Sequence, residues 1–334
     1  MPPKKDQETS KQKELEKRQN RDEKSQKPFH FADRLNDHIK AKKSSVCVGL
    51  DPRLEQVPAF IREKHFAKHS NPFTAAAESA LEFCMGIIDA THDLVPVIKP
   101  QLAFFEQFGS EGVRVFEELV WYARSKNLLT ISDAKRGDIG STAEAYAKAF
   151  LGKVDVMGKE LFVFDTDAIT VNPYLGFDGI KPFATECRKH GKGMFILVKT
   201  SNVTSSDLQD LEMQDKNTVY EIMAQYLESW GADDIGESGY SFMGAVVGAT
   251  FPAQAKKLRK LMPNTIFLVP GYGAQGGTAK DVKECFNKDG LGAIVNASRS
   301  IMYAWENSDT YTEKDFADAA RAAVEKMNKD IAEA

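Results

Sequence analysis

The chain has 334 residues, 42% of them hydrophobic and 28% charged, which is enough to build one large α/β domain or two smaller ones. The net charge of −4 is small and spread along the chain, so the sequence lacks the basic footprint of a nucleic-acid-binding protein. No continuous apolar membrane span and no apolar secretory signal is present, and we therefore expect a cytoplasmic protein without a membrane partner.

The cysteines are few and widely separated. They form no C-x-x-C pair, so we expect reduced, mostly buried thiols and no metal site or disulfide framework. The four residues are Cys47, Cys84, Cys187 and Cys285.

The first 28 residues are almost entirely polar or charged, and Leu15 is their only large aliphatic residue after the initiator methionine. Such a segment buries too little apolar surface to offset its ordering entropy, so we expect residues 1–28 to form a disordered charged tail. The folded domain, residues 29–334, should begin with an amphipathic helix in the run FHFADRLNDHIKAKK.

Eight short apolar runs of β character follow, and most are separated by stretches with helical spacing of apolar residues. The runs are 46–50, 95–99, 128–132, 168–172, 194–199, 243–249, 265–269 and 293–296, and the helical stretches include 73–91, 111–126, 179–190, 218–230, 253–261 and 278–287. Eight such units predict a single (β/α)₈ TIM barrel with a parallel sheet. A doubly wound open sheet is the alternative, but no G-x-G-x-x-G follows the first strand. We expect loop elaborations at 53–71, 152–165 and 202–217.

The third run opens into the stretch LLTISDAKRGDIGSTAEAYAKAFL, which concentrates charge at a strand end. Residues two apart on a strand point to the same side, so Asp133 and Lys135 should project together. With Arg136 and Asp138 they place four charges within six residues. A solvated loop with a surface ion pair is an equally good interpretation of the charge density alone. The strand before it and the helix after it favour a functional site.

The same stretch should then turn into a helix. Gly137 permits the turn, and Ser141 to Glu144 match the S-x-x-E capping box. Asp138 is therefore expected in a tight connection between strand and helix.

Polar residues also end other predicted strands, and in a TIM barrel these carboxyl ends form the functional face. Lys99 ends an apolar strand, where an unpaired ammonium is costly, and the available carboxylate partners are Asp133 and Asp138. Asp51, taken alone, is better interpreted as a turn cap before Pro52.

A glycine-rich run, PGYGAQGG, follows the seventh strand, and Arg299 follows the eighth. Its four glycines let backbone N–H groups approach an anion. This arrangement matches the phosphate site that such barrels form from the loops after strands seven and eight.

Together these runs resemble the orotidine 5′-phosphate decarboxylase family, in the variant with the motif D-x-K-R-x-D-I-G-x-T-A. The resemblance rests on VGLDPR, VIKPQLAFFEQFG, DAKRGDIGSTAEAYA, LVKTSN, VPGYGAQGG and NASRS, in that order along the chain. It extends from about residue 29 to the helix after the eighth strand.

This resemblance implies a homodimeric barrel that converts orotidine 5′-phosphate to UMP and carbon dioxide without a metal or an organic cofactor. The implied catalytic residues are Lys99, Asp133, Lys135 and Asp138, with Lys135 as the proton donor to C6 of the pyrimidine.

The resemblance also implies a set of substrate contacts. Asp51 and Lys99 would hold ribose hydroxyls, Thr200 and Ser201 would face the pyrimidine, and Gln275 and Arg299 would hold the phosphate. Asp138, Ile139 and Thr142 would enter the site of the second subunit, while Gln101 has no assigned role.

The implied chemistry fits the charged residues, because loss of carbon dioxide from C6 leaves a carbanion without a conjugated electron sink. Fixed charge must then stabilise it, and Lys135 held by Asp133 and Asp138 can do so. Two alternatives stay open: a keto sugar-phosphate decarboxylase of the same superfamily, which would need metal-binding carboxylates, and a non-catalytic nucleotide-binding barrel.

Overall fold

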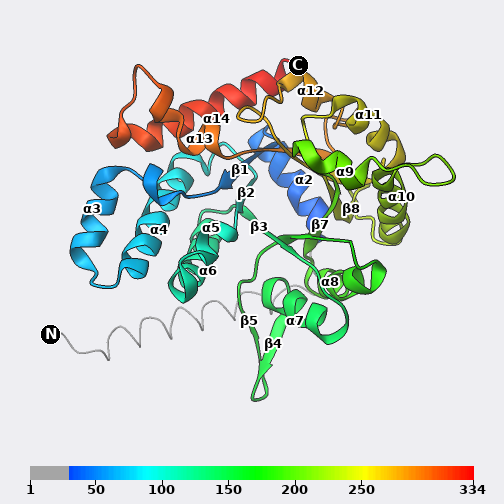
Figure 1. Cartoon of the computed structure of the whole chain (residues 1–334), viewed down its shortest axis with the longest axis horizontal. Helices are drawn as coiled ribbons and strands as arrows, with labels where there is room; N and C mark the ends of the chain where they lie inside the picture. Colours follow the sequence, from blue (N-terminus) through cyan, green and yellow to red (C-terminus); the bar gives the residue numbers. More distant parts are fainter. Residues whose placement is uncertain (1–29) are drawn as a thin grey trace.

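Eight parallel strands form one closed barrel in the computed structural model, which describes residues 30–334 (Figure 1). The strands are β1 (Val46–Leu50), β2 (Val97–Pro100), β3 (Leu129–Arg136), β6 (Ala168–Val171), β7 (Gly193–Lys199), β8 (Ser241–Val247), β9 (Thr265–Pro270) and β10 (Ala293–Ala297). The barrel closes where Val46 of β1 pairs with Val295 of β10. The predicted (β/α)₈ fold is confirmed, and the tail predicted for residues 1–28 lies outside the described residues.

The barrel strands are buried on both faces, which explains why they read as continuous apolar runs. Every residue of β1, β6 and β8 is buried. One face packs inside the barrel and the other packs under the surrounding helices, so neither face needs polar side chains. Each of the eight predicted runs overlaps one of these strands.

Helices surround the barrel (Figure 1). They include α4 (Pro72–Thr91), α5 (Ala103–Glu106), α6 (Gly109–Ser125), α7 (Gly140–Phe150), α8 (Phe177–His190), α10 (Val219–Gly231), α11 (Pro252–Leu261), α12 (Ala279–Lys283), α13 (Arg299–Met302) and α14 (Phe316–Ala332). Five of the helical stretches predicted above are confirmed as α4, α6, α8, α10 and α11. The stretch predicted over 278–287 ends early at Lys283, and Asn287 instead donates its side-chain amide to the carbonyl of Pro263 at 2.9 Å.

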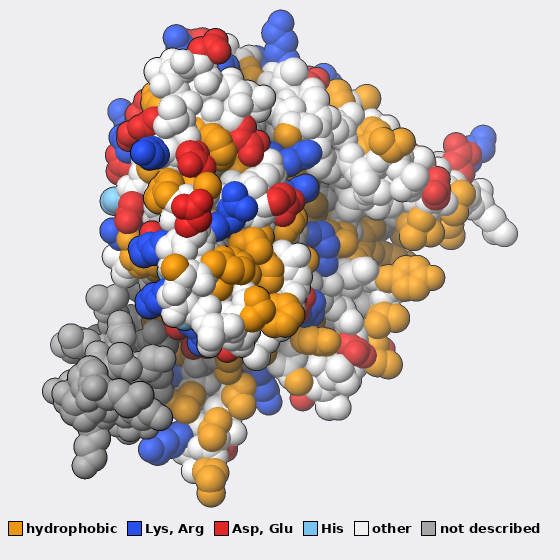
Figure 2. Space-filling model, turned by 60° about the vertical axis from the view of Figure 1, so that its left-hand side comes forward, with side chains coloured by type: hydrophobic (Ala, Val, Ile, Leu, Met, Phe, Trp, Pro, Cys, Tyr) orange, Lys and Arg blue, Asp and Glu red, His pale blue; other side chains and the backbone are white. Residues whose placement is uncertain are grey.

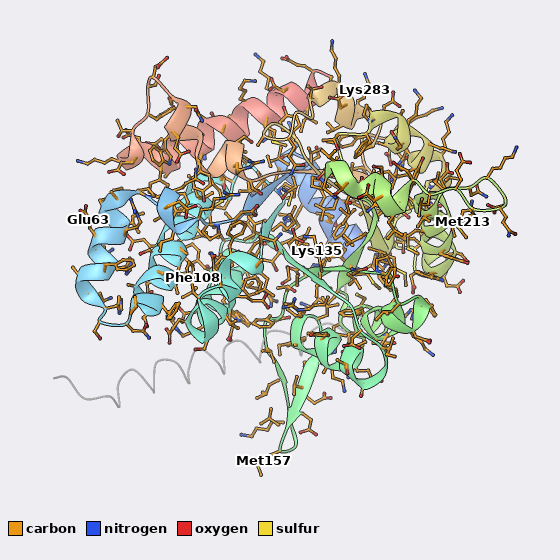
Figure 3. All side chains as sticks on the ribbon, in the orientation of Figure 1. Glu63, Phe108, Lys135, Met157, Met213 and Lys283 are labelled. Carbon is orange, nitrogen blue, oxygen red and sulfur yellow. The ribbon has the colours of Figure 1, made fainter. Side chains whose placement is uncertain are left out.

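The three stretches predicted as loops contain secondary structure. The first holds η2 (Leu54–Gln56) and α3 (Ala59–Lys68), and the third holds η3 (Val203–Ser205) and α9 (Ser206–Gln209). The second forms an antiparallel hairpin of β4 (Lys153–Val156) and β5 (Lys159–Phe162). Met157 and Gly158 make its two-residue turn with φ angles of 53° and 85°, and Figure 3 shows Met157 at the free end of the hairpin.

Helix α7 begins two residues earlier than the capping motif implies. It starts at Gly140, and no side chain caps its N-terminus. Ser141 and Glu144 are therefore the second and fifth residues of the helix, and the predicted capping box is wrong. Gly140, with a φ of 53°, turns the chain into the helix before Ser141 is reached.

Helix α2 (Phe31–Lys42) lies across the amino-terminal end of the barrel, which confirms the first predicted helix. The Phe31 ring packs edge-on against Phe195 of β7, with ring centroids 6.0 Å apart. Arg34 pairs with Asp167, directly before β6, at 2.5 Å. Asp33 accepts a hydrogen bond from the Ser238 N–H, before β8, at 2.7 Å. All these contacts are at or near the beginnings of strands, so the opposite end of the barrel is left for the site.

The thiols are buried, as the compositional analysis predicts. All four cysteines are buried and free. On the face shown in Figure 2, basic side chains are interspersed with acidic ones. No helix within residues 30–334 combines the length and apolar character that a membrane crossing requires.

The contact between α2 and the barrel yields a stability prediction. A Cβ atom added at Gly193 would lie 2.2 Å from the Phe31 ring, so Gly193→Ala should overpack this junction. We expect the free energy of unfolding to fall by about 1–3 kcal/mol in urea titrations. In a Phe31→Ala background the same change should have little effect, and an equal loss in both backgrounds would contradict this packing.

Candidate active site

Three charged side chains meet where β2 and β3 end. Lys99 Nζ lies 2.6 Å from Asp133 Oδ2, and Lys135 Nζ lies 2.6 Å from Asp133 Oδ1. Lys99 and Asp133 are buried, whereas the Lys135 side chain is 45% exposed. Lys135 is thus the member of the cluster most open to a ligand, and Figure 3 shows it near the middle of the view.

Two neutral side chains complete the surroundings of Asp133. Gln101 Nε2 donates to Oδ2 at 2.8 Å, and Thr170 Oγ1 donates to Oδ1 at 2.9 Å. With the two lysines, they provide a donor for each of the roughly four acceptor positions of a carboxylate. The sequence left the role of Gln101 open and gave Thr170 no role. A hydroxyl inside the otherwise apolar strand β6 was the available signal for Thr170.

The backbone at Lys135 is not a regular strand. Its φ is 45°, and the register between β3 and β6 shifts between Ser132 and Arg136. The Lys135 N–H donates to Thr170 Oγ1 at 2.9 Å, which holds this bend in place. Asp133 and Lys135 therefore lie side by side as predicted, but a left-handed backbone residue brings them together.

Burial and charge act in opposite directions on this cluster. Burial alone would raise the pKa of Asp133, but Lys99 and Lys135 hold that pKa well below its usual range. Burial alone would lower the pKa of Lys99, but the carboxylates of Asp133 and Asp51 hold it above its usual range. The pair is therefore ionised at neutral pH.

Asp51, directly after β1, is a second carboxylate in the same electrostatic environment. Burial raises its pKa above the usual range, against the opposing effect of Lys99. Its Oδ1 atom is buried and accepts no hydrogen bond from the described residues. An acceptor in this state can be satisfied by a ligand hydroxyl.

The predicted pairing of Lys99 is half confirmed, because Asp133 is its partner and Asp138 is not. The Asp138 carboxylate instead accepts the Ile139 N–H at 2.8 Å, and within residues 30–334 it pairs with neither lysine. Ile139 and Thr142 are exposed at the start of α7.

An apolar surface surrounds this turn. Ile139, Tyr174, Leu175 and Phe177 are each at least 39% exposed, and we call these four residues the α7–α8 surface. Helices α7 and α8 pack against each other, and a Cβ atom at Gly179 would lie 3.0 Å from the Asp138 carbonyl oxygen. The turn that carries Asp138 is thus fixed next to exposed hydrophobic side chains.

The end of β7 meets the glycine-rich loop after β9. Gly271 has a φ of 102°, and a Cβ atom there would lie 3.2 Å from Gln275 Oε1 and 3.4 Å from Ser201 Cβ. Ser300 Oγ lies 3.1 Å from the corresponding position at Gly273, which brings the start of α13 beside the same loop. Arg299, the first residue of α13, is exposed.

Thr200 differs from Ser201 in how its hydroxyl is used. Thr200 Oγ1 donates to Asn202 Oδ1 at 2.7 Å and accepts from Gln209 Nε2 at 2.8 Å. The Ser201 hydroxyl makes no hydrogen bond with the described residues, while its carbonyl accepts from Thr250 at 3.2 Å. The free hydroxyl at this strand end is therefore that of Ser201.

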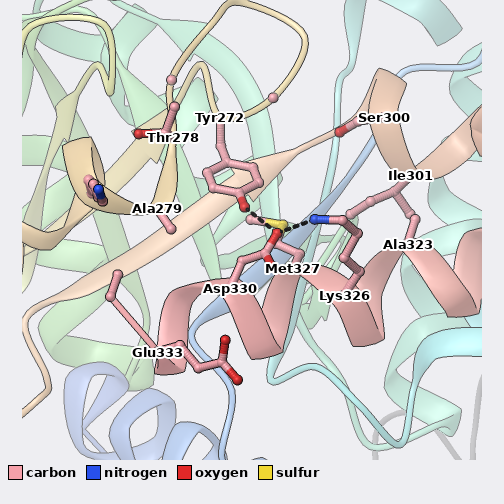
Figure 4. A pocket seen from close by; sticks show the side chains of 14 residues that line it. Tyr272, Thr278, Ala279, Ser300, Ile301, Ala323, Lys326, Met327, Asp330 and Glu333 are labelled. Carbon is pink, nitrogen blue, oxygen red and sulfur yellow. Dashed lines mark hydrogen bonds and ion pairs between the residues drawn. The ribbon is translucent and has the colours of Figure 1, made fainter.

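A pocket of about 700 Å³ lies beside the glycine-rich loop, between α13 and α14 (Figure 4). Tyr272 lines it, together with Lys326 and Asp330, which pair at 2.5 Å. None of the residues paired with Asp133 lines this pocket, so it is separate from the charged cluster. Within residues 30–334, no three His, Cys, Asp or Glu side chains are grouped to hold a metal ion.

Comparison with known proteins identifies the family of this chain. A family model described as "Orotidine 5'-phosphate decarboxylase / HUMPS family" matches residues 44–313. A Caldicellulosiruptor bescii protein named orotidine 5′-phosphate decarboxylase is 42% identical over 303 residues, which cover 91% of this chain and 98% of that relative. A Rhodopirellula baltica protein of the same name is 44% identical over 304 residues, covering 90% and 98% of the two chains. The structure of Leishmania donovani OMP decarboxylase has 32% identity and a TM-score of 0.68, and the match covers 92% of this chain and 100% of that one.

Replacing Asp133 should show how much its ion pairs contribute to the free energy of unfolding. Asp133→Asn leaves Lys99 buried beside a neutral amide, so we expect the free energy of unfolding to fall by about 3–5 kcal/mol at pH 7. Because the folded-state pKa of Asp133 is lowered, its stabilisation is present above the unfolded pKa of about 4 and is lost as pH falls below it. The difference between wild type and variant in urea titrations should therefore shrink at pH 3.

Asp233→Asn, which changes an exposed carboxylate, is the matched control and should leave stability nearly unchanged. An equal loss for Asp133→Asn at pH 3 and pH 7 would contradict the lowered pKa.

Proposed function

The chain belongs to the orotidine 5′-phosphate decarboxylase / HUMPS family, and we propose that its Asp133 cluster removes carbon dioxide from orotidine 5′-phosphate to form UMP. The observation that carries this proposal is a buried carboxylate held between two ammonium groups, Lys99 and Lys135, at the carboxyl end of a barrel. The protein is thereby a carboxy-lyase of de novo pyrimidine synthesis.

The charged side chains stabilise the C6 carbanion, which has no conjugated electron sink. When the bond between C6 and the carboxylate breaks, its electron pair stays on C6 and carbon dioxide leaves. Lys135 stabilises this negative charge and then transfers a proton from Nζ to C6, which gives UMP. Asp133 holds the Lys135 ammonium in place through their 2.6 Å contact, and solvent later restores the transferred proton.

The neighbouring strand ends offer the remaining substrate contacts. Asp51 would accept hydrogen bonds from ribose hydroxyls, because its buried Oδ1 has no partner in the described chain. Lys99 would donate to the same hydroxyls. Thr200 and Ser201 would face the pyrimidine, where Ser201 contributes a free hydroxyl. The phosphate would lie at the glycine-rich loop with Gln275 and Arg299. Binding energy from this remote group can orient the reacting carbon.

We also propose that the protein works as a homodimer. In one chain Asp138 contacts neither lysine, although it is fixed in a turn directly beyond Lys135. The α7–α8 surface around it exposes apolar side chains of the kind that subunit interfaces bury. Asp138, Ile139 and Thr142 of each subunit would then complete the site of the other subunit.

The same reaction scheme needs no metal or organic cofactor, because the fixed charges replace an electron sink. Four buried free thiols support a reducing compartment, and we place the protein in the cytoplasm. A keto sugar-phosphate decarboxylase forms an enediolate with a metal, so decarboxylation of orotidine 5′-phosphate in a chelator separates the two functions.

Lys135→Ala should abolish the decrease in orotate absorbance in this chelator assay while UMP affinity, measured by calorimetry, stays close to wild type. The ammonium is needed for the carbanion and the proton, whereas the phosphate and ribose contacts remain. Lys148→Ala, at an exposed position on α7, should be fully active. Near-normal turnover by Lys135→Ala would refute its role, and an inactive wild type would favour a non-catalytic nucleotide-binding barrel.

Mixing two inactive variants tests the shared site. In a dimer of one Lys135→Ala chain and one Asp138→Ala chain, one of the two sites keeps both residues. An equimolar, re-equilibrated mixture should therefore recover about one quarter of wild-type activity, since about half of the dimers are mixed. Lys135→Ala mixed with Lys99→Ala should recover nothing. One chain supplies both lysines of a site, so each site of a mixed dimer lacks one of them. No recovery in the first mixture would contradict the shared site.

A further inference from the structure

Lys199, the last residue of β7, is completely buried and carries a charge that the proposed chemistry does not use. Its Nζ donates to Asp210 Oδ1 at 2.8 Å and to Ser205 Oγ at 3.1 Å. The ammonium also lies 4.6 Å from the centroid of the Phe251 ring. Buried lysines are rare unless they are paired, so this position holds a specific interaction and not only hydrophobic filling.

A second pair of bonds lies beside the first. Gln209 Oε1 accepts the Thr200 N–H at 3.0 Å, and Gln209 Nε2 donates to Thr200 Oγ1 at 2.8 Å. Two consecutive residues at the end of α9, Gln209 and Asp210, thus bind two consecutive residues at the end of β7, Lys199 and Thr200. We call these four residues the β7 latch.

The latch, and not apolar packing, holds the segment between η3 and residue 211. Val203, Leu208 and Leu211 are 87%, 51% and 52% exposed, so their burial contributes little to the position of this segment. Charge-assisted and paired hydrogen bonds in a partly buried setting are strong enough to fix this segment instead.

The next residue in the chain is the one that the latch orients. Ser201 follows Thr200 directly, and its Cα lies 2.8 Å from the position of a Cβ atom at Gly248. On its other side Ser201 packs beside Gly271 of the glycine-rich loop. Gln209 thus holds Thr200, and the close contacts with Gly248 and Gly271 hold the backbone and Cβ of Ser201, which carry the free hydroxyl.

We propose that Lys199, Gln209 and Asp210 are positioning residues that determine recognition of the pyrimidine base, because they hold Thr200 and Ser201 at the mouth of the barrel. This inference rests on the proposed function. The ligands it concerns are pyrimidine nucleotides, whose polar base edge meets the Ser201 hydroxyl, while a ligand without a base bypasses the latch.

The two members of the charge pair differ in what their loss would do. Asp210 is one-third exposed and can be hydrated when Lys199 is removed, whereas Lys199 without Asp210 would be a buried ammonium left with Ser205. Lys199→Met keeps a long side chain beside Phe251 and is therefore the milder change. Gln209→Met removes both bonds to Thr200 without affecting the buried charge.

The test compares two ligands by calorimetry on the full-length protein. For Lys199→Met and Gln209→Met we expect UMP affinity to fall roughly tenfold, which corresponds to the loss of one or two oriented hydrogen bonds between the base and the protein. The affinity for ribose 5-phosphate should stay unchanged. The KM for orotidine 5′-phosphate should rise by a similar factor. Asp207→Asn, an exposed residue of α9 without a latch bond, is the matched control and should match wild type for both ligands.

Other outcomes overturn the inference. Equal weakening of both ligands would mean that the latch supports only the general fold, and unchanged UMP affinity would mean that it positions nothing. The double variant Lys199→Met/Asp210→Asn should lose no more UMP affinity than the worse single variant, and additive losses would show that the two residues act separately. A wild-type protein that fails to bind UMP would instead overturn the proposed function itself, and this inference with it.

Discussion

The whole site depends on one carboxylate that has no acceptor position left over. Asp133 receives hydrogen bonds from Lys99, Gln101, Lys135 and Thr170, which reach it from β2, the turn after β2, β3 and β6. Three neighbouring strands are therefore tied together at their carboxyl ends by a single side chain. Because every bond fixes both partners, the two ammonium groups are preorganised before any ligand arrives, which is the condition for electrostatic stabilisation of a transition state.

The two ends of the barrel differ in the interactions that they contain. At the amino end, α2 packs Phe31 into the space that Gly193 leaves open and pairs Arg34 with Asp167. At the carboxyl end, strand termini hold charges whose burial would be unfavourable anywhere else in the core. The amino end and the apolar strands contribute hydrophobic burial, whereas the carboxyl end adds the ion pairs of Asp133. The carboxyl end also carries the left-handed backbone of Lys135 and the Oδ1 of Asp51, which has no partner among the described residues.

The sequence was sufficient to predict the barrel, because the patterns that indicate its strands and helices are local. Apolar runs and helical spacing identify strands and helices one at a time, and the carboxyl ends of the strands then locate Asp133 and Lys135 without further information. Contacts between distant segments were not accessible in the same way. Thr170 and Gln209 act through hydrogen bonds to other elements, and the capping motif at Ser141 failed because Gly140 begins the helix earlier. Hairpin β4–β5 was missed because a turn at Met157 carries only a weak local signal.

The closure of the barrel has a consequence for synthesis on the ribosome. The first strand gains its second neighbour only when β10 exists, through the pairing of Val46 with Val295, and Tyr303 then donates its hydroxyl to the Asp51 carbonyl at 3.0 Å. The part of the barrel mouth around Asp51 is therefore unfinished until nearly the whole chain has emerged from the exit tunnel. For most of its elongation, the nascent chain must keep the unpaired, apolar edge of β1 shielded from other chains. Early chaperone contact is therefore more important here than in a fold whose first and last strands do not pair with each other.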